Sequence, residues 1–506
     1  MDFIQGISRN QLFLMNLDGH VSKDSWARII DLFVNLMDLE KLGFKDLLQK
    51  EGRPPFHSSV LLKLLLYGYK NNIRSSRKLQ KACEVNLEVI WLLNGLKPSA
   101  RTIAYFRKKS SKAIKNLMTK FVHILQDWDL IGGQTIAIDS FKIRAQNSLK
   151  NNFNQKKIDR HIEYIDNKIE QYIDILEQND SLNEIEQEKI ENKIKHNLDK
   201  KQKYQQIENQ LKESGQTQIS TTDPDSRSVV LHRNIVNVGY NIQASSDSKY
   251  FLFINNQTGD VNDTHALAPM ALEVKSILGL EQFNTLTDKG YTTGEQIAIC
   301  MANNITTYSS PKEHASNHNG LYSMNKFIYD KTNDTYQCPN KSILKTNGRY
   351  YKKANYEIKH YKTKACLNCK LSNKCTANKK GRLIERSIYQ DVLEENKQRV
   401  ESNPKYYKLR QQVTEHQFGT MKRPWGFTYT LMKGKENVLT EVNLMMICYN
   451  LRRLMSIFGI DELKRRLKDL FYPFLALWFI NSPLKRLNFP NYLVLHGQCQ
   501  KSIYYF

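Results

Sequence analysis

The sequence has few cysteines and no long hydrophobic run. Its 506 residues include 8 Cys, too few for a fold built on disulfide bonds. No apolar stretch reaches the roughly 20 residues that a membrane-spanning helix needs, so we expect no membrane partner. The first ten residues lack the basic and apolar pattern of a secretion signal. This absence favours a cytoplasmic protein.

Acidic residues are scarce relative to basic ones. The chain has 75 Lys and Arg against 51 Asp and Glu, a formal net charge of +24. Such an excess indicates a polyanionic partner more readily than a small neutral substrate. Residues 155–215 hold 11 basic and 14 acidic residues, whereas residues 331–390 hold 15 basic and only 3 acidic residues. The second segment therefore supplies half of the net charge and is the expected anion-binding surface.

Within this basic segment, aromatic residues alternate with cations, as in Tyr350, Tyr351, Lys352, Lys353 and Tyr356. Cations could bind phosphates while the rings stack on exposed bases, an arrangement that suits nucleic acid. We therefore predict that Lys352 and Lys353 bind DNA. The alternative is an ordinary lysine-rich surface, and the composition leaves both interpretations open.

Four of the cysteines also lie in this segment, with the spacing C-x27-C-x2-C-x5-C: Cys338, Cys366, Cys369 and Cys375. Four thiolates can complete a closed tetrahedral Zn²⁺ site. Because the segment is highly charged and poor in aliphatic residues, we expect it to need a metal in order to fold. Four reduced cysteines without metal and an iron–sulfur cluster are the alternatives. The isolated cysteines are predicted to be buried: Cys83, Cys300, Cys448 and Cys499.

Hydrophobic periodicity predicts helical and mixed regions along the chain. Residues 1–130 are predicted to form an all-helical domain, suited to DNA binding or to packing alone; one long helix begins at Ser99. Strands and helices alternate over residues 131–154 and 216–311, which is typical of a mixed α/β sheet. Residues 391–460 would complete this core with a helix over 394–421. The remaining parts are the basic segment, 312–390, and a tail, 461–506.

Residues 155–215 interrupt this predicted core. Ile158, Ile162, Ile165 and Ile169 follow spacings of four and three, which predicts one helix of a coiled-coil hairpin. Ser181 and Glu184 match a capping box for the second helix. Such an arm more often serves spacing or dimer contacts than chemistry.

Two aspartates lie at the predicted ends of strands, Asp139 in TIAIDSF and Asp288 in TLTDKGY. Adjacent strands would bring them together at the edge of a sheet where ligands commonly bind. A third carboxylate, Glu415, lies on a later helix with Lys422 on nearly the same face. Three hard oxygen ligands suit Mg²⁺, and a pair of such ions about 3.5–4 Å apart could activate a water or a 3′-hydroxyl. Either aspartate could instead be a cap or turn residue.

Several motifs in a fixed order carry a resemblance to a known family: IAIDSFKIRAQNS, TTDPDSR, VGYNIQA, VNDTHALAPM, TDKGY and EHQFGTMKRPWGF. With FHSSVLLKLLLYGYK near the N-terminus, they resemble bacterial DDE-type insertion-sequence transposases, in particular insertion-sequence family 1182. The resemblance implies an RNase H-like α/β core in which Asp139, Asp288 and Glu415 bind Mg²⁺ or Mn²⁺. The helical hairpin and the basic segment would then be insertions in that core.

The resemblance also implies a function and partners. A transposase of this type binds the terminal inverted repeats of its element, cleaves the ends by metal-assisted hydrolysis and joins the 3′-hydroxyl to target DNA. It would act on the bacterial nucleoid as a homodimer or a larger synaptic complex. Tyr407, Arg410, Lys422 and Arg423 would contact DNA. A sequence-specific DNA-binding regulator and a metal-dependent nuclease without strand transfer are the alternatives.

Overall fold

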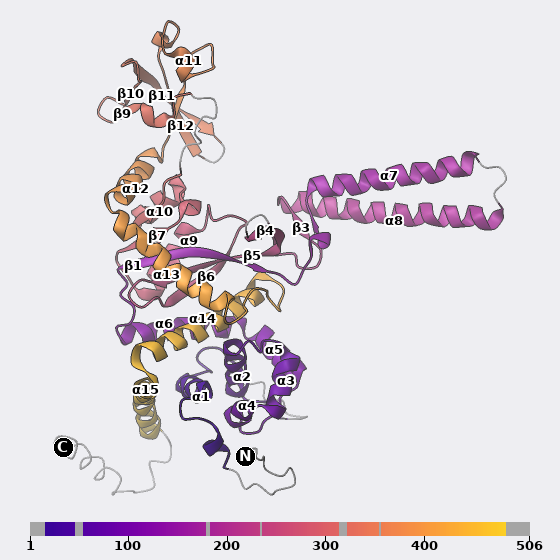
Figure 1. Ribbon diagram of the computed structural model, residues 1–506, viewed down its shortest axis with the longest axis vertical. Helices are drawn as coiled ribbons and strands as arrows, with labels where there is room; N and C mark the ends of the chain where they lie inside the picture. The colour runs from indigo at the N-terminus through magenta and orange to yellow at the C-terminus, as the bar shows by residue number, and fades with distance from the viewer. Residues whose placement is uncertain are drawn as a thin grey trace, which may run out of the picture. The chain divides into compact units, whose positions relative to one another are not determined.

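The computed structural model describes residues 16–45, 54–178, 183–232, 235–312, 321–353 and 356–481 (Figure 1). It divides into two compact units, one of residues 1–113 with 450–506 and the other of residues 114–449. The first unit therefore combines segments from the two ends of the sequence.

The first unit is helical in its described part. Its core includes leucines of one helix that is buried on most sides, among them Leu62, Leu64 and Leu65. Ser99 caps a helix as predicted, accepting a hydrogen bond from the Thr102 backbone N–H. The predicted long helix is wrong, because this helix ends at Lys109 and another begins at Ser111. The helices of this unit are α1 (Trp26–Leu36), α2 (Ser58–Lys70), α3 (Ser76–Val85), α4 (Leu87–Leu92), α5 (Ala100–Lys109) and α15 (Ile460–Asn481), preceded by the 3₁₀ turn η1 (Leu17–His20).

The second unit is built on the predicted mixed sheet. Its strands are β1 (Thr135–Arg144), β4 (Arg227–His232), β5 (Ile235–Asp247), β6 (Phe253–Gly259), β7 (Phe283–Thr287) and β8 (Ile305–Ser309). They follow the order β4-β5-β1-β7-β8, with β6 also paired to β5. The pairs β1–β5 and β5–β6 are antiparallel, whereas β1–β7 and β7–β8 are parallel.

Helices cover both faces of this sheet: α6 (Ser111–Asp127), α9 (Leu267–Leu278), α10 (Gly294–Ala302), α12 (Gln390–Ser402), α13 (Pro404–Lys422) and α14 (Lys435–Phe458). Successive side chains of a strand point to opposite faces. On β6, Asn256 donates a hydrogen bond to Asn443 of α14, while Asn255 and Gln257 donate to Glu273 of α9. Helices α9 and α14 therefore lie on opposite sides of β6.

The predicted single helix over 394–421 is wrong. It is divided into α12 and α13 at Asn403, because Pro404 has no backbone N–H to continue the helix and instead occupies the first turn of α13. None of the helices in the described part of the chain combines the length and the apolar character that crossing a lipid bilayer demands.

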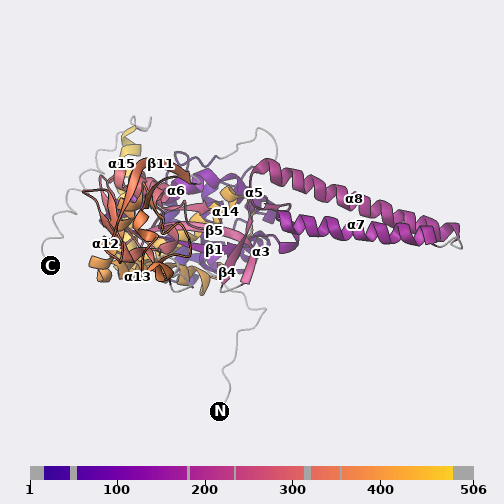
Figure 2. The same cartoon turned by 90° about the horizontal axis from the view of Figure 1, so that it is seen from above.

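The predicted helical hairpin consists of α7 (Gln155–Gln178) and α8 (Glu184–Ser214), which lie side by side in both views (Figures 1 and 2). Its base packs around Phe153, Ile158, Ile207 and Leu211, next to the short pair β2 (Asn152–Phe153) and β3 (Ile219–Ser220). The predicted cap is wrong. Asn183 and Glu186 form the capping box of α8, and Ser181 lies outside the described residues.

The basic segment forms a second, antiparallel sheet of β9 (Ile328–Asp330), β10 (Thr335–Gln337), β11 (Ile343–Lys353), β12 (Tyr356–Lys362) and β13 (Ile384–Ser387). It has its own hydrophobic core, made of Phe327, Tyr336, Leu344, Tyr361 and Ile384. Two of the clustered cysteines, Cys338 and Cys375, pack against this core. Aromatic side chains bury large areas where aliphatic side chains are few.

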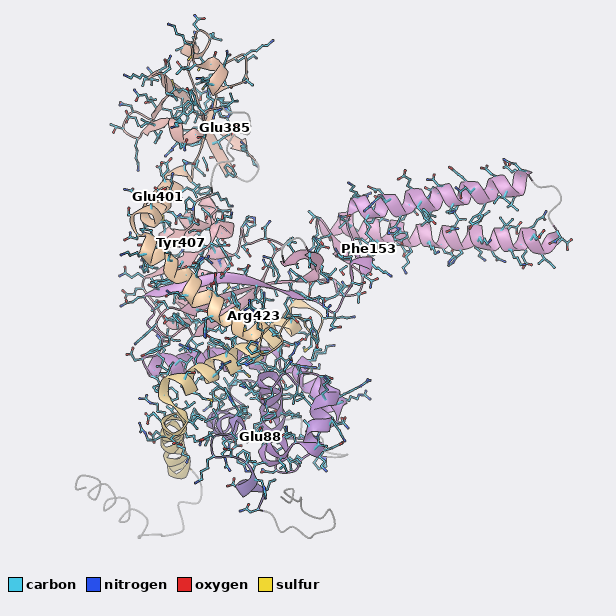
Figure 3. The ribbon with its side chains drawn as sticks, viewed as in Figure 1. Glu88, Phe153, Glu385, Glu401, Tyr407 and Arg423 are labelled. Atoms are coloured by element: carbon cyan, nitrogen blue, oxygen red, sulfur yellow. The ribbon has the colours of Figure 1, made fainter. Side chains whose placement is uncertain are left out.

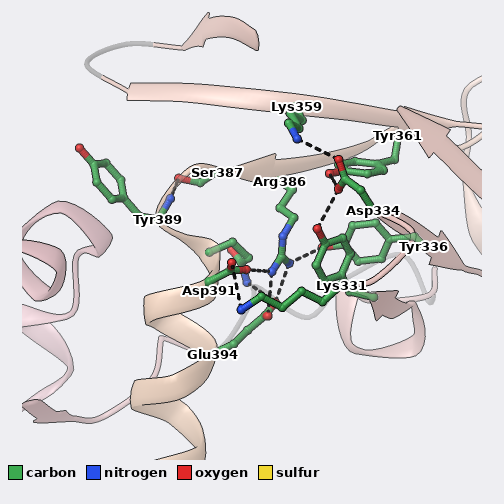
Figure 4. Close-up of polar contacts among 12 residues, drawn as sticks. Lys331, Asp334, Tyr336, Lys359, Tyr361, Arg386, Ser387, Tyr389, Asp391 and Glu394 are labelled. Carbon is green, nitrogen blue, oxygen red and sulfur yellow. Dashed lines mark hydrogen bonds and ion pairs between the residues drawn. The ribbon is translucent and has the colours of Figure 1, made fainter. Parts of the chain in front are cut away.

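Arg386 connects this basic sheet to helix α12 (Figure 4). Its guanidinium donates hydrogen bonds of 2.8 and 2.9 Å to Glu394 and one of 2.8 Å to the Tyr336 hydroxyl, and it also pairs with Asp391. The guanidinium carbon lies 3.6 Å from the centre of the Tyr329 ring. The charge is thus buried with partners on both the sheet and the helix, an arrangement that fixes their junction.

Candidate functional site

Asp139 and Asp288 lie at the same edge of the mixed sheet. Strands β1 and β7 are parallel, with Ala137 opposite Leu286. Asp139 lies two residues after Ala137, and Asp288 lies two residues after Leu286, so the two aspartates are at the same level of the sheet. Asp288 comes directly after β7, as predicted. Asp139 does not end its strand, because β1 continues to Arg144 alongside β5. It lies where the parallel pairing to β7 stops, at the carboxyl edge where ligands commonly bind.

Helix α13 covers this edge. Val413 packs against Ala137 and Leu286. Nearby, Arg410 Nη1 donates a hydrogen bond of 3.0 Å to Asp139 Oδ2, and both side chains are largely buried. Arg410, predicted to contact DNA, therefore pairs with the first aspartate.

The predicted DNA contact Tyr407 lies on the same helix (Figure 3). Its hydroxyl donates a 3.1 Å hydrogen bond to the carbonyl oxygen of Thr287, the residue before Asp288. Tyr407 and Arg410 thus support the two strands that carry the aspartates, in a structure that contains no DNA.

Glu415, Lys422 and Arg423 lie farther along α13. Glu415 is exposed, and its side chain has no hydrogen bond or ion pair within the described residues. The Lys422 ammonium lies 5.7 Å from the centre of the Phe141 ring, and Arg423 is exposed where the helix ends. Over the described ranges, no three His, Cys, Asp or Glu side chains are grouped closely enough to hold a metal ion. The structure therefore brings the two aspartates together and leaves Glu415 outside their group.

The charges at this edge are strongly perturbed. Burial raises the pKa of Asp139, and the Asp288 carboxylate raises it further, although the Ser140 N–H and Arg410 act in the opposite direction. Burial also lowers the pKa of the Lys422 ammonium. Asp139 thus lies where negative charge is costly and an added cation would be stabilised. Hard carboxylate oxygens suit Mg²⁺ or Mn²⁺.

The turn after β7 explains the glycine of TDKGY. The Gly290 N–H donates a 2.7 Å hydrogen bond to Asp288 Oδ1. A Cβ atom at residue 290 would lie 2.9 Å from that oxygen and 3.4 Å from Asp263 Oδ2. Two carboxylates therefore border the space that a side chain at this position would occupy. Asp263 lies in the motif VNDTHALAPM, but it follows no predicted strand end or helix face that would mark it as a site residue.

The four clustered cysteines lie near one another, although no three of them are grouped closely enough to hold a metal ion in the described part of the chain. All four border one cavity of about 20 Å³ within the basic segment, and none forms a disulfide. Burial raises the pKa of the Cys375 thiol, Arg382 lowers it, and the other three cysteines raise it. The predicted burial of Cys83, Cys300 and Cys448 is confirmed, while Cys499 lies outside the described residues.

Strand β11 presents the predicted cations and rings. Lys352 and Lys353 are exposed, and the exposed fraction of Tyr350 is 54%. The Tyr351 ring stacks on His360 with 4.3 Å between ring centres, and Lys353 pairs with Glu385. The strand therefore offers positive charge beside accessible aromatic faces.

Two family models match parts of the chain. A transposase DDE domain matches residues 337–455, and a transposase domain, DUF772, matches residues 15–109. No curated protein matches the chain. Among solved structures, the cryo-EM structure of the piggyBac transposase synaptic complex with hairpin DNA matches with a TM-score of 0.30 and 9% identity, covering 90% of this chain and 82% of that chain.

The two matched domains fit the architecture of insertion-sequence family 1182, the family that the sequence motifs resemble. The DDE domain contains helix α13, which covers Asp139 and Asp288 at the edge of the mixed sheet. The chain therefore carries a DDE transposase domain, which indicates a metal-dependent enzyme that cleaves DNA and transfers its strands.

Proposed function

We propose that this transposase binds the terminal inverted repeats of its element, hydrolyses the DNA at their ends and joins the freed 3′-hydroxyl to target DNA. The observation that carries the proposal is the matched placement of Asp139 and Asp288 beneath a helix of the DDE domain. Two ends have to be joined, so the working form would be a dimer or a larger synaptic complex. Its substrate is chromosomal, which favours the cytoplasm of a bacterium and association with the nucleoid.

We also infer an RNase H-like core. The supporting feature is the strand order β6-β5-β1-β7-β8, in which the first three strands are antiparallel and the last two run parallel to β1. The hairpin of α7 and α8 leaves this core between β1 and β4, and the basic sheet leaves it between β8 and α12. Both positions are those expected of insertions.

In this proposal Asp139, Asp288 and Glu415 would hold Mg²⁺ or Mn²⁺, and Glu415, which lies outside the group of the two aspartates, would have to move toward them. The bound ion would supply activation of a water and stabilisation of the leaving oxygen. Arg410 neutralises Asp139 in the protein without metal, and Tyr407 holds the strand that leads to Asp288. The other predicted DNA contacts would bind phosphates of the transposon end: Lys422, Arg423, Lys352 and Lys353. Zinc would be held by the four cysteines that share a cavity.

The test uses a labelled duplex carrying the element's terminal repeat, with Mg²⁺. We expect Asp139→Asn to reduce nicking about a thousandfold, since the metal supplies several kcal/mol of transition-state stabilisation. Duplex binding should persist. Glu281→Gln, which neutralises an exposed acid in the loop before β7, is the matched control and should nick normally. Nicking by Asp139→Asn at the wild-type rate would refute the assigned site.

The same assay separates the alternative functions. A DNA-binding regulator would bind the repeat without nicking it under any metal condition. A nuclease without strand transfer would nick the repeat but never join the labelled end to a plasmid. Joined product that depends on Asp139 supports the transposase proposal over both alternatives.

A further inference from the structure

We propose that Asp263 is a positioning residue of the cleavage site, which holds the segments of Asp139 and Asp288 in the arrangement that a divalent cation requires. The inference rests on the proposed function, because it takes the cation to bind at these two aspartates. Asp263 lies in the loop between β6 and α9, on neither of the strands that carry them.

Both carboxylate oxygens of Asp263 accept hydrogen bonds from other segments. Oδ1 accepts from Asn241 Nδ2 at 2.7 Å and from Gln243 Nε2 at 2.6 Å, both on β5. Oδ2 accepts from the Ser140 hydroxyl on β1 at 3.2 Å. One carboxylate therefore connects the loop to two adjacent strands of the sheet.

These contacts lead directly to the two aspartates. The Ser140 backbone N–H donates a 2.8 Å hydrogen bond to Asp139 Oδ1, so the residue held by Asp263 also orients the first acid. On the other side, Asp263 Oδ2 and Asp288 Oδ1 both border the vacant side-chain position of Gly290. Tyr291, which follows Gly290, is buried and donates to Gln243. Asp263 is thus the common neighbour of the segments that carry both acids.

The charge of Asp263 distinguishes this role from that of a simple structural link. A third carboxylate beside Asp139 and Asp288 disfavours the cation-free state, because like charges repel in a partly buried site. The same charge favours a bound cation. In addition, Asn241 is 2% exposed, and its Oδ1 has no hydrogen-bond partner among the described residues. Within the described residues, Asn241 Oδ1 is therefore a buried acceptor without a donor, beside the Asp263 carboxylate.

The test measures Mn²⁺ binding to the full-length protein by electron paramagnetic resonance of the free ion. Groups that support metal ligands typically change affinity 10- to 100-fold, so we expect Asp263→Asn to raise the Kd for Mn²⁺ by about this factor. Asp260→Asn removes an exposed charge three residues away and should bind as the wild type does. Without metal, the melting temperature of Asp263→Asn should stay within a few degrees of the wild-type value. If Asp263 were purely structural, the substitution would instead lower the melting temperature and leave the Mn²⁺ affinity unchanged.

Wild-type Mn²⁺ affinity in Asp263→Asn would overturn the inference. If that variant does not fold, Ser140→Ala provides the second test, since it removes one hydrogen bond to Asp263 and should weaken Mn²⁺ binding severalfold; unchanged affinity would overturn the inference. Asp139→Asn separates this inference from the proposed function. If Asp139→Asn binds Mn²⁺ like the wild type, the proposed metal site itself fails and the inference fails with it.

Discussion

At the scale of single residues, Gly290 is the most constrained position of the site. The atoms that a Cβ would meet belong to the Asp288 and Asp263 side chains, which can rotate away without unfolding the sheet. A substitution would thus displace the carboxylates while leaving the fold largely intact.

We therefore predict that Gly290→Ala lowers DNA nicking at least about tenfold, a loss of roughly 1.4 kcal/mol in transition-state stabilisation, with little change in melting temperature. Gly419→Ala is the control. Nothing lies within 4 Å of a Cβ there, and alanine in helix α13 should stabilise the protein by about 0.5–1 kcal/mol. Nicking by Gly290→Ala at the wild-type rate would contradict the steric argument.

The two aspartates could be proposed from sequence because each follows a β-rich run, and parallel strands end at one edge. Asp263 could not. Its bond to Asn241 joins residues 22 positions apart, and it depends on how the loop after β6 folds back over β5. The pairing of Arg410 with Asp139 has the same origin, since helix α13 is placed by the packing of Val413 on the sheet.

At the scale of elements, helix α12 is fixed to the mixed sheet by Asn396. This side chain is fully buried. It donates a 2.7 Å hydrogen bond to the Ser309 carbonyl and accepts one of 3.0 Å from the Ser309 N–H. The Asn396 amide thereby satisfies both backbone groups of Ser309 on β8, the strand at the edge of the sheet. The contacts of Arg386 with Asp391 and Glu394 connect the first turns of α12 to the basic sheet.

We predict that Asn396→Ala destabilises the protein by about 2–4 kcal/mol, because two buried backbone groups lose their partner. Urea unfolding of the full-length chain would measure this change. Gln398→Ala, at an exposed position of the same helix, should alter the free energy of unfolding by less than about 0.5 kcal/mol. Equal effects of the two substitutions would show that the Asn396 contacts do not fix the helix.

The basic sheet permits a separate prediction about zinc. We expect one zinc ion per chain in the purified protein, because four thiols border a single small cavity. Cys366→Ser combined with Cys369→Ser should abolish zinc binding, whereas Cys300→Ala, at an isolated buried cysteine, should retain it. Elemental analysis is the measurement, and a metal-free wild-type protein would contradict the prediction.

The sequence predicted most elements of the second unit because helices and strands impose the periods 3.6 and 2 on their apolar residues. The alternation of strands and helices expected over residues 216–311 is present, with strands β4 to β8 and helices α9 and α10. The errors arose where one residue interrupts a periodic run, as at Pro404. In the basic segment, large aromatic residues far apart in sequence form a core that an aliphatic pattern does not reveal.

At the scale of the whole molecule, the positive net charge is unevenly distributed along the chain. The hairpin segment, residues 155–215, carries more acidic than basic residues, while residues 331–390 carry half of the net +24. Binding to DNA releases counterions in proportion to the number of phosphates contacted. The salt dependence of DNA binding can therefore locate the binding surface.

We predict that Arg349→Gln combined with Lys352→Gln, two exposed cations of β11, weakens DNA binding and reduces the slope of log K against log salt by about two. The control removes the same charge from the hairpin. Lys195→Gln with Lys200→Gln, both exposed on α8, should leave the slope unchanged. Equal slopes for the two double variants would place the DNA away from the basic sheet. Asp139→Asn should keep the wild-type slope.

The sequence by itself determined the order of helices and strands, the location of the excess positive charge and the two aspartates at one sheet edge. These features follow from local periodicity, composition and the direction of parallel strands. Only the tertiary structure decided that Arg410 meets Asp139, that Asp263 joins the segments of both acids and that the basic sheet has an aromatic core. Such contacts depend on strand register and on the packing of helices over the sheet, which bring together side chains that no local pattern relates.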